Sequence, residues 1–342
     1  MTTAGTSLDP LDRLAVAPSE AWRSVLAEAV CDPSELCRRL GLPADLAGEA
    51  AEAVGQFPMR VPRGYLGRIR PGDPHDPLLA QVLPRKEELA EVPQFVTDPL
   101  GEAAAACAPG LLRKYKGRLL ILASAACGVH CRFCFRRHFP LEKTAAGQDW
   151  DRTLAQIAAD PTIDEVVLSG GDPLTMSDPQ LSQIAARLAE IPHLRRMRIH
   201  TRLPIVIPER VTDELLGWLR GTRLTPIVVV HLNHPAEIDA AVALALGRLV
   251  DAGVPVLSQA VLLRGVNDQA DVLAELFVRL VDLRVVPYYL HQLDRVAGAA
   301  HFEVPEPRGR ELIRQLRQRL PGYAVPRYVR DEVGAGCKRV VE

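Results

Sequence analysis

From about residue 117 onward, short apolar runs alternate with longer amphipathic stretches, and no other feature constrains the fold as much. Continuous apolar strands that alternate with helices indicate a parallel sheet covered by helices. Six successive βα units therefore predict an α/β fold, a partial (β/α)6 barrel with a mainly helical N-terminal extension. Periodicity alone leaves a flat, doubly wound sheet open as the alternative. The apolar runs lie at 118–124, 164–170, 195–201, 224–232, 254–263 and 284–292.

The spacing of apolar residues divides the chain into three predicted segments. Residues 1–110 carry helical patterns broken by Pro and Gly, which indicate a helical and irregular extension. Residues 111–320 hold the βα units, and residues 321–342 form a C-terminal tail. In a parallel α/β domain the active site lies where the strands end at their carboxyl termini. The functional residues should therefore follow the apolar runs.

Charge and hydropathy exclude some partners. The 41 Lys and Arg side chains nearly balance the 42 Asp and Glu side chains, so nothing draws the whole chain to nucleic acid or to an anionic membrane. No apolar run approaches the roughly 18–20 residues that span a bilayer. The first 15 residues lack the basic start and apolar stretch of a secretion signal. We therefore expect a cytoplasmic protein, in which clustered cysteines indicate metal binding or catalysis.

Three of the seven cysteines lie within eight residues, in the motif CGVHCRFC. Cys127, Cys131 and Cys134 directly follow the first apolar run of the sheet. Three thiolates on one short loop can bind three irons of a [4Fe–4S] cluster and leave the fourth iron open to a chelating ligand such as S-adenosylmethionine. The alternative is a zinc site completed by His130 or His138.

The motif SGGDP follows the second apolar run. Gly170 and Gly171 let the backbone approach a ligand closely, and Asp172 adds an acceptor. Beside a cluster loop, this motif is suited to the amino group of S-adenosylmethionine. A plain βα turn is the alternative. The motifs HTR, HLNHP and LDRVAG end later apolar runs in the same way, and we interpret the two histidines of HLNHP as structural.

Several charged residues have both a structural and a functional interpretation. Lys338 follows a glycine-containing loop and is either a solvated charge or a Schiff-base lysine on a mobile loop. Arg136 follows the third cysteine and is suited to a bidentate grip on a carboxylate. Asp294 and Asp331 are either surface charges or a pair that holds an ammonium group. A basic and aromatic group before the first strand could hold a phosphate, and consists of Lys114, Tyr115 and Arg118.

From about residue 78 onward the chain resembles the lysine 2,3-aminomutase family of radical S-adenosylmethionine, pyridoxal-phosphate enzymes. The segments that carry this resemblance are DPLLAQVLPRKEEL, DPLGE, KYKGRLLIL, CGVHCRFCFRRHFP, SGGDPL, HLNHPAEI, QAVLLRGVND, YYLHQLDRVAGAAHF and the terminal lysine. The resemblance implies that the three clustered cysteines hold the [4Fe–4S] cluster. It also implies that Lys338 binds pyridoxal phosphate, whose phosphate contacts Lys114, Tyr115 and Arg118. The positions that match the S-adenosylmethionine site are Ser169, Gly170, Gly171, Asp172 and Gln259.

The same resemblance implies the substrate, L-lysine, and its contacts. Arg136 would bind the carboxylate, and Asp294 with Asp331 would hold the far ammonium. The segments CFRRHFP and LHQLDRVAGAAHF most resemble the shorter branch that serves elongation factor P, whose ligase attaches the (R)-β-lysine product. A flavodoxin or ferredoxin would donate the electron. Homo-oligomerisation is left open, because the extra cysteines of the larger members are absent.

Three rival functions remain at this point. The first is a metabolic aminomutase that acts on lysine or on another amino acid. The second is a non-enzymatic metal-binding module, which predicts no dependence on Lys338. The third is a doubly wound protein that binds a nucleotide at SGGDP, which leaves the cysteines unexplained.

Overall fold

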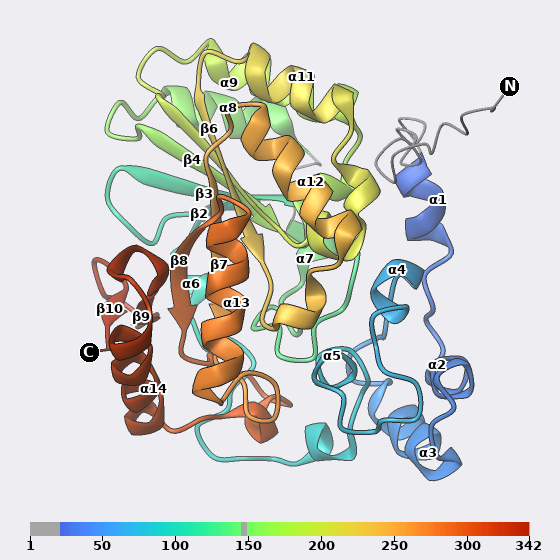
Figure 1. Ribbon diagram of the computed structural model, residues 1–342. Coiled ribbons are helices and arrows are strands. Elements are labelled where there is room, and N and C mark those ends of the chain that lie inside the picture. The colour runs from blue at the N-terminus through green and yellow to red at the C-terminus, as the bar shows by residue number, and fades with distance from the viewer. Residues whose placement is uncertain (1–20, 145–148, 342) are drawn as a thin grey trace, which may run out of the picture.

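The computed structural model describes residues 21–144 and 149–341, and its centre is one curved, open sheet of ten strands (Figure 1). The strands are hydrogen-bonded in chain order. The first 20 residues, for which no secretion signal is expected, lie outside the described part. The strands are β1 (Ala106–Ala108), β2 (Leu111–Leu112), β3 (Arg118–Ser124), β4 (Glu165–Gly170), β5 (Arg196–Thr201), β6 (Thr225–His231), β7 (Val256–Val261), β8 (Val286–His291), β9 (Arg327–Arg330) and β10 (Arg339–Val340).

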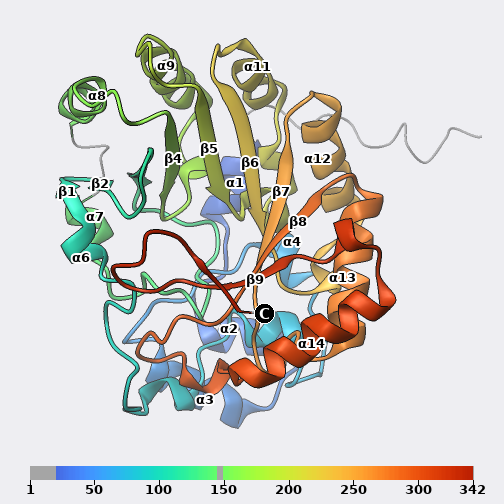
Figure 2. The same ribbon diagram turned by 90° about the vertical axis from the view of Figure 1, so that its left-hand side faces the viewer.

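Strands β3 to β9 run parallel, and antiparallel strands complete both edges of the sheet. The predicted α/β fold with six successive βα units is confirmed, and the sheet stays open instead of closing into a barrel. Figure 2 shows the long helices following one another along the outer side of this curve. These helices are α8 (Trp150–Ala158), α9 (Asp178–Ala189), α11 (Asp213–Gly221), α12 (Ala240–Asp251), α13 (Ala270–Asp282) and α14 (Glu306–Arg319).

Residues 321–342, which the sequence predicts as a tail, extend the sheet. Strand β9 pairs in parallel with β8, and β10 turns back beside β9. The sequence does not predict these strands, because a strand of four or two residues is too short to give a periodic pattern. Their position brings Lys338 to the edge of the parallel sheet.

The N-terminal extension consists of short helices that pack on the ends of the parallel strands (Figure 1). Its buried residues, such as Trp22 and Tyr65, belong to the same hydrophobic core as the sheet. In the described ranges no helix is long and apolar enough to cross a bilayer. The helices of the extension are α1 (Ala21–Ala27), α2 (Pro33–Leu40), α3 (Ala44–Ala53), α4 (Arg63–Leu66), α5 (Pro77–Ala80) and α6 (Glu102–Ala105). Two one-turn helices lie later in the chain, α7 (Leu141–Thr144) and α10 (Leu203–Val206).

Candidate active site

The cysteine loop begins at the end of β3 and packs directly against the glycines at the end of β4. A Cβ on Gly170 would lie 2.5 Å from the Ser124 carbonyl oxygen, and a Cβ on Gly171 would lie 2.3 Å from that of Ala126. Both distances are too short for any side chain. The N–H groups of Gly171 and Asp172 donate to these same two carbonyls. The glycines thus allow a close approach of the backbone to the protein's own loop, whereas the sequence interpretation has the backbone approach a ligand there.

Asp172 ties the end of β4 to the end of β5. Its buried carboxylate accepts hydrogen bonds from the Thr201 hydroxyl at 2.7 Å and from the Arg202 backbone N–H at 2.7 Å. It also accepts from the N–H groups of Leu203 and Leu174. Burial raises its pKa, against the lowering effect of these donors. Asp172 therefore fixes the strand ends around the cysteine loop.

The three thiols of the loop fit a metal cluster in their chemistry. Burial raises the pKa of Cys127 and raises that of Cys134 to about 11, so each thiolate needs a positive partner. Bound iron supplies such a charge and displaces the thiol proton. In residues 21–144 and 149–341 no three His, Cys, Asp or Glu side chains converge on one ion position. A cubane does not need that convergence, because each thiolate binds a different iron.

The zinc alternative requires a histidine beside these thiols. The His130 ring nitrogen Nδ1 lies 2.9 Å from the Pro58 carbonyl oxygen, and Nε2 of His138 lies 3.0 Å from that of Ala297. Each contact uses one ring nitrogen and leaves the other able to bind a metal. A zinc ion, however, needs its ligands to converge on one position, and within the described residues no three such side chains do so. This favours the cluster over the zinc site.

The N-terminal extension holds the cysteine loop through a buried carboxylate. Glu88 pairs with Arg132 at 2.6 Å and with Arg137 at 2.7 Å, and all three side chains are fully buried. Arg132 also donates to the carbonyls of Phe57 and Pro58. The extension, through its segment DPLLAQVLPRKEEL, thereby fixes both arginines that follow the second and third cysteines.

We expect the Glu88→Gln variant to be less stable than the wild type by about 3–5 kcal/mol, because it leaves buried arginine charge uncompensated. The free energy of unfolding from urea denaturation would measure this loss. Glu87→Gln is the matched control, because Glu87 is the exposed neighbour of Glu88 and makes no such arginine pair within the described residues. Equal stability of the two variants would contradict the structural role of Glu88.

Arg136 reaches a second buried carboxylate. Its Nε and Nη2 donate to both oxygens of Glu102 at 2.7 and 2.8 Å. Its Nη1 donates to the Ser169 hydroxyl and to the Gly170 carbonyl. Four of the five guanidinium N–H donors are therefore used, and one on Nη2 remains for a further ligand. Asp98 holds Glu102 in place by accepting from the N–H groups at the start of α6.

A second cluster of predicted residues joins the chain between the last two strands of the sheet, β9 and β10, to the segment before β3. The Lys338 ammonium donates to one oxygen of Asp331, and the Tyr115 hydroxyl donates to the other. The Lys114 ammonium lies 3.9 Å from the same carboxylate. The Arg118 guanidinium lies over the Tyr115 ring, 5.3 Å from its centroid. Five side chains from β3, the segment before it and the segment between β9 and β10 thus form one polar group.

The two aspartates of this region have opposite electrostatic properties. The neighbouring ammonium groups of Lys338 and Lys114 hold the pKa of Asp331 down at about 2, against the effect of burial. Burial, and then the charge of Asp331, raise the pKa of Asp294 to about 7. Near neutral pH the Asp331 carboxylate is therefore fully charged. The Asp294 carboxyl is only partly ionised, and a cation bound beside it would lower its pKa and release the proton to solvent.

We expect Asp294→Asn to stabilise the protein at pH 8 by a few kcal/mol and to have little effect near pH 4. The folded state holds the Asp294 proton more tightly than the unfolded state, so the wild type loses stability as pH rises from about 4 to about 7. Denaturant unfolding at both pH values measures the difference. Asp331→Asn should be destabilising at pH 8, because it removes a charge that the fold favours. The same sign for both variants at pH 8 would contradict this assignment.

Three histidines stand at the ends of β5, β6 and β8. Burial lowers the pKa of His200, His231 and His291, and the Lys338 charge adds to this effect at the first and the last of them. Nε2 of His200 and Nε of Arg198 are buried without a hydrogen-bond partner in the described residues. A polar ligand bound beside Lys338 would supply the missing partners. Gln259 of β7 lies in register with His231.

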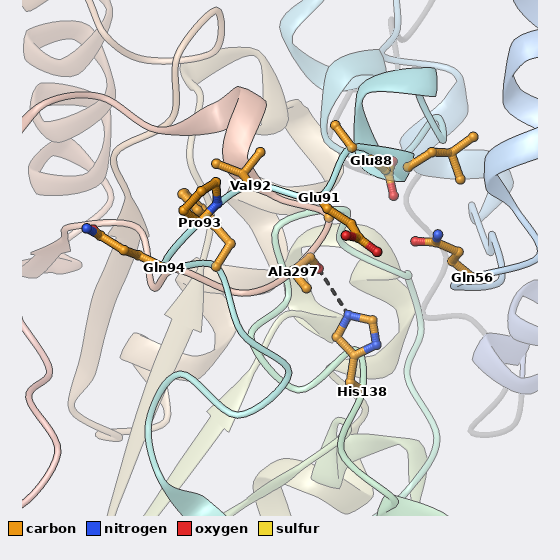
Figure 3. A pocket seen from close by; sticks show the side chains of 12 residues that line it. Gln56, Glu88, Glu91, Val92, Pro93, Gln94, His138 and Ala297 are labelled. Atoms are coloured by element: carbon orange, nitrogen blue, oxygen red, sulfur yellow. Dashed lines mark hydrogen bonds between the residues drawn. The ribbon is translucent and has the colours of Figure 1, made fainter.

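A pocket of about 710 Å³ lies on the outside of the cysteine loop, between residues 88–95 and 297–298. Figure 3 shows His138 on its wall, hydrogen-bonded to Ala297, with the carboxylates of Glu88 and Glu91 nearby. Its lining includes His138, which the zinc alternative considers, and Glu88, which pairs with Arg132 and Arg137. No described residue that lines it belongs to the cluster around Lys338 and Asp331.

Comparison with curated proteins identifies the relatives of this chain. It is 45% identical over 323 residues to the L-lysine 2,3-aminomutase of Escherichia coli, covering 93% of this chain and 94% of that protein. The chain belongs to the L-lysine 2,3-aminomutase family. The Haemophilus influenzae member is 43% identical over 92% of this chain and 93% of its own. The Clostridium subterminale member is 38% identical, over 94% of this chain and 77% of its own. No family model matches the chain.

Among solved structures, Streptococcus suis SuiB bound to S-adenosylmethionine gives a TM-score of 0.48 at 15% sequence identity, covering 64% of this chain and 51% of that chain.

The structure brings to the site three residues that the sequence does not predict. Glu88 and Glu102 hold the arginines that follow the cysteines. Arg202 contacts a cysteine directly. All three lie in quoted motifs, Glu88 in DPLLAQVLPRKEEL, Glu102 in DPLGE and Arg202 in HTR, but those motifs gave none of them a role.

Proposed function

We propose that this chain is an L-lysine 2,3-aminomutase, which converts (S)-α-lysine to (R)-β-lysine. The amino group moves from carbon 2 to carbon 3 and a hydrogen atom moves the opposite way, so the reaction is a balanced isomerisation. One observation carries the proposal, the partly buried contact between the Lys338 ammonium and Asp331, in the electrostatic range of Asp294. The far end of a substrate lysine has the same chemistry as the Lys338 side chain.

The cofactors that fit these residues are a [4Fe–4S] cluster, S-adenosylmethionine and pyridoxal phosphate. Cys127, Cys131 and Cys134 would hold the cluster, and Lys338 would hold the pyridoxal group. When bound, these groups supply a carbon-centred radical and a conjugated ring that delocalises an unpaired electron. The positions that would line the S-adenosylmethionine site are Ser169, Gly170, Gly171 and Asp172 at the end of β4, and Gln259 on β7. Lys114, Tyr115 and Arg118 would hold the phosphate.

The side chains of this protein contribute recognition and positioning. When the Lys338 nitrogen is engaged by the cofactor, Asp331 is free to accept the ε-ammonium of the substrate. Asp294 loses its proton readily in the field of that new cation and becomes the second acceptor. Arg136, oriented by Glu102, offers its remaining N–H to the substrate carboxylate. Fixing both ends of lysine places its second and third carbons at one position.

The experiment is an anaerobic assay of the purified protein. Iron and sulfide are reconstituted, S-adenosylmethionine, pyridoxal phosphate and dithionite are added, and L-lysine is compared with L-glutamate and L-ornithine. We expect β-lysine as the main product, resolved from α-lysine by chromatography after derivatisation, because the two isomers have the same mass. Glutamate should be inert, because its second carboxylate would face two aspartates. Turnover of glutamate in preference to lysine would overturn the substrate assignment, and no turnover of any amino acid would overturn the activity.

We also propose that the product modifies elongation factor P, through a ligase, in the cytoplasm, with a flavodoxin or ferredoxin as the electron donor. The support is the resemblance of CFRRHFP and LHQLDRVAGAAHF to that branch of the family. In a strain that lacks this gene, elongation factor P should lose the mass of one β-lysyl group. An unchanged mass would favour a metabolic aminomutase instead.

A further inference from the structure

Arg202 makes a direct contact with one of the predicted cluster ligands. It lies immediately after β5, and its guanidinium is almost completely buried. Its Nη1 donates to the Cys131 sulfur at 2.7 Å, and its Nη2 donates to Glu237 at 2.8 Å and to Gln81 at 2.7 Å. One guanidinium therefore joins a thiol to a buried carboxylate and to the N-terminal extension.

Each partner of Arg202 is itself fixed. Glu237 accepts from the backbone N–H groups of Asn233 and His234, at 2.8 and 3.1 Å. The side-chain amide of Gln81 donates to Glu237 as well. A guanidinium held on several sides cannot turn away from the sulfur when the charge on the sulfur changes. The rings that flank it belong to Tyr65 and Phe133, with centroids 5.6 and 5.7 Å from the guanidinium carbon.

This contact distinguishes Cys131 from the other two ligands. Of the three loop cysteines, Cys131 is the one whose sulfur accepts a hydrogen bond from an arginine side chain within the described residues. The third nitrogen of Arg202, Nε, is buried with no partner of its own in those residues. A negatively charged cluster beside Cys131 would supply an acceptor for it. The guanidinium is therefore positioned to interact with negative charge beside Cys131.

We propose that Arg202 and Glu237 together set the reduction potential of the cluster through Cys131. Reduction adds negative charge to the irons and sulfurs, so an N–H donor on a cysteine sulfur stabilises the reduced form and raises the potential. Glu237 places a negative charge behind Arg202 and opposes part of this effect. Arg202 is in this sense a positioning residue, and the inference rests on the proposed function because it requires the cluster.

The test is a redox titration of the reconstituted, full-length protein, followed by electron paramagnetic resonance. Arg202→Met with Glu237→Gln removes both charges together and so leaves no unpaired buried ion. We expect its midpoint potential to be more negative than that of the wild type. Glu237→Gln alone keeps the arginine on the sulfur and removes the opposing charge, so its midpoint should shift to more positive values.

The matched control is another buried pair of the same chemistry. Arg210 pairs with Asp178 at 2.8 Å, at a position where it contacts no cysteine. Arg210→Met with Asp178→Asn should bind iron and sulfide normally and keep the wild-type potential. It separates the effect of losing any buried ion pair from the effect of losing the contact with Cys131.

Three outcomes would overturn the inference. The first is a wild-type potential in the double variant at full iron content. The second is a shift of the same sign in both Glu237 variants. The third is an equal shift in the Arg210 control. If the double variant does not fold, the sign of the Glu237→Gln shift alone decides, because a negative shift or none contradicts the proposal. A wild-type protein that binds no cluster would instead overturn the proposed function.

Discussion

Replacing Lys338 with alanine is expected to lower β-lysine formation by on the order of 1,000-fold or more, because the variant loses the amine that holds the cofactor in place. Its visible pyridoxal absorbance after gel filtration should disappear with the activity. The cysteine loop contacts other residues, so iron and sulfide content should stay at the wild-type level. Asp331 also loses its ammonium partner, so its pKa should rise toward the ordinary value for a carboxyl group.

The control for this variant is Lys116→Ala. Lys116 lies in the same short segment as Lys114 and Tyr115, but its side chain is exposed. It should retain both the absorbance and the activity. Full activity of Lys338→Ala would contradict the assignment of this amine and would reopen the non-enzymatic alternative, which predicts no dependence on it.

Changing any one of Cys127, Cys131 or Cys134 to serine should abolish activity to the limit of detection. A serine hydroxyl replaces a soft thiolate poorly as a ligand to iron, so the reconstituted protein should lose most of its broad visible iron–sulfur absorption. Iron and sulfide analysis measures the loss, and pyridoxal binding at Lys338 should persist. The two cofactor sites are thereby tested independently.

Cys107→Ser is the control for the three cysteine variants. Cys107 lies on the edge strand β1, and its thiol hydrogen-bonds a carbonyl outside the loop. Iron content and activity should match the wild type. A cluster that survived any of the three loop substitutions unchanged would show that another residue completes the ligand set.

The sequence predicts those parts of this protein that depend on local pattern. Six strands and the helices between them follow from period and apolarity, and the cysteine loop follows from spacing. The convergence of Lys338 with Asp331 and Tyr115 could be predicted only from the family resemblance. These residues are up to 223 positions apart, and no pairing of neighbouring strands joins them, because β3 and β9 are six strands apart in the sheet.

The residues that escaped prediction are the ones that hold other side chains. Glu102 lies 34 positions before Arg136, and Glu237 lies 35 positions after Arg202. Both acidic residues lie in segments of the family resemblance, DPLGE and HLNHPAEI, but the sequence does not show which arginine each one binds. The partner is set by the packing of two elements and not by spacing. The glycines of SGGDP were recognised as special, but the close backbone that requires them belongs to the cysteine loop.

The hydrogen bonds around the cysteine loop bear on how the enzyme survives oxygen. His130 and Arg132 donate their backbone N–H groups to Arg60 and Gln81 of the extension, and Gly171 donates to Ser124 at the start of the loop. In small zinc domains the metal drives folding, so loss of the metal is loss of the fold. Here the protein's own contacts hold the loop. Oxidative destruction of the cluster should therefore leave a folded chain that can be repaired by reinsertion, without passing through chaperones or proteolysis.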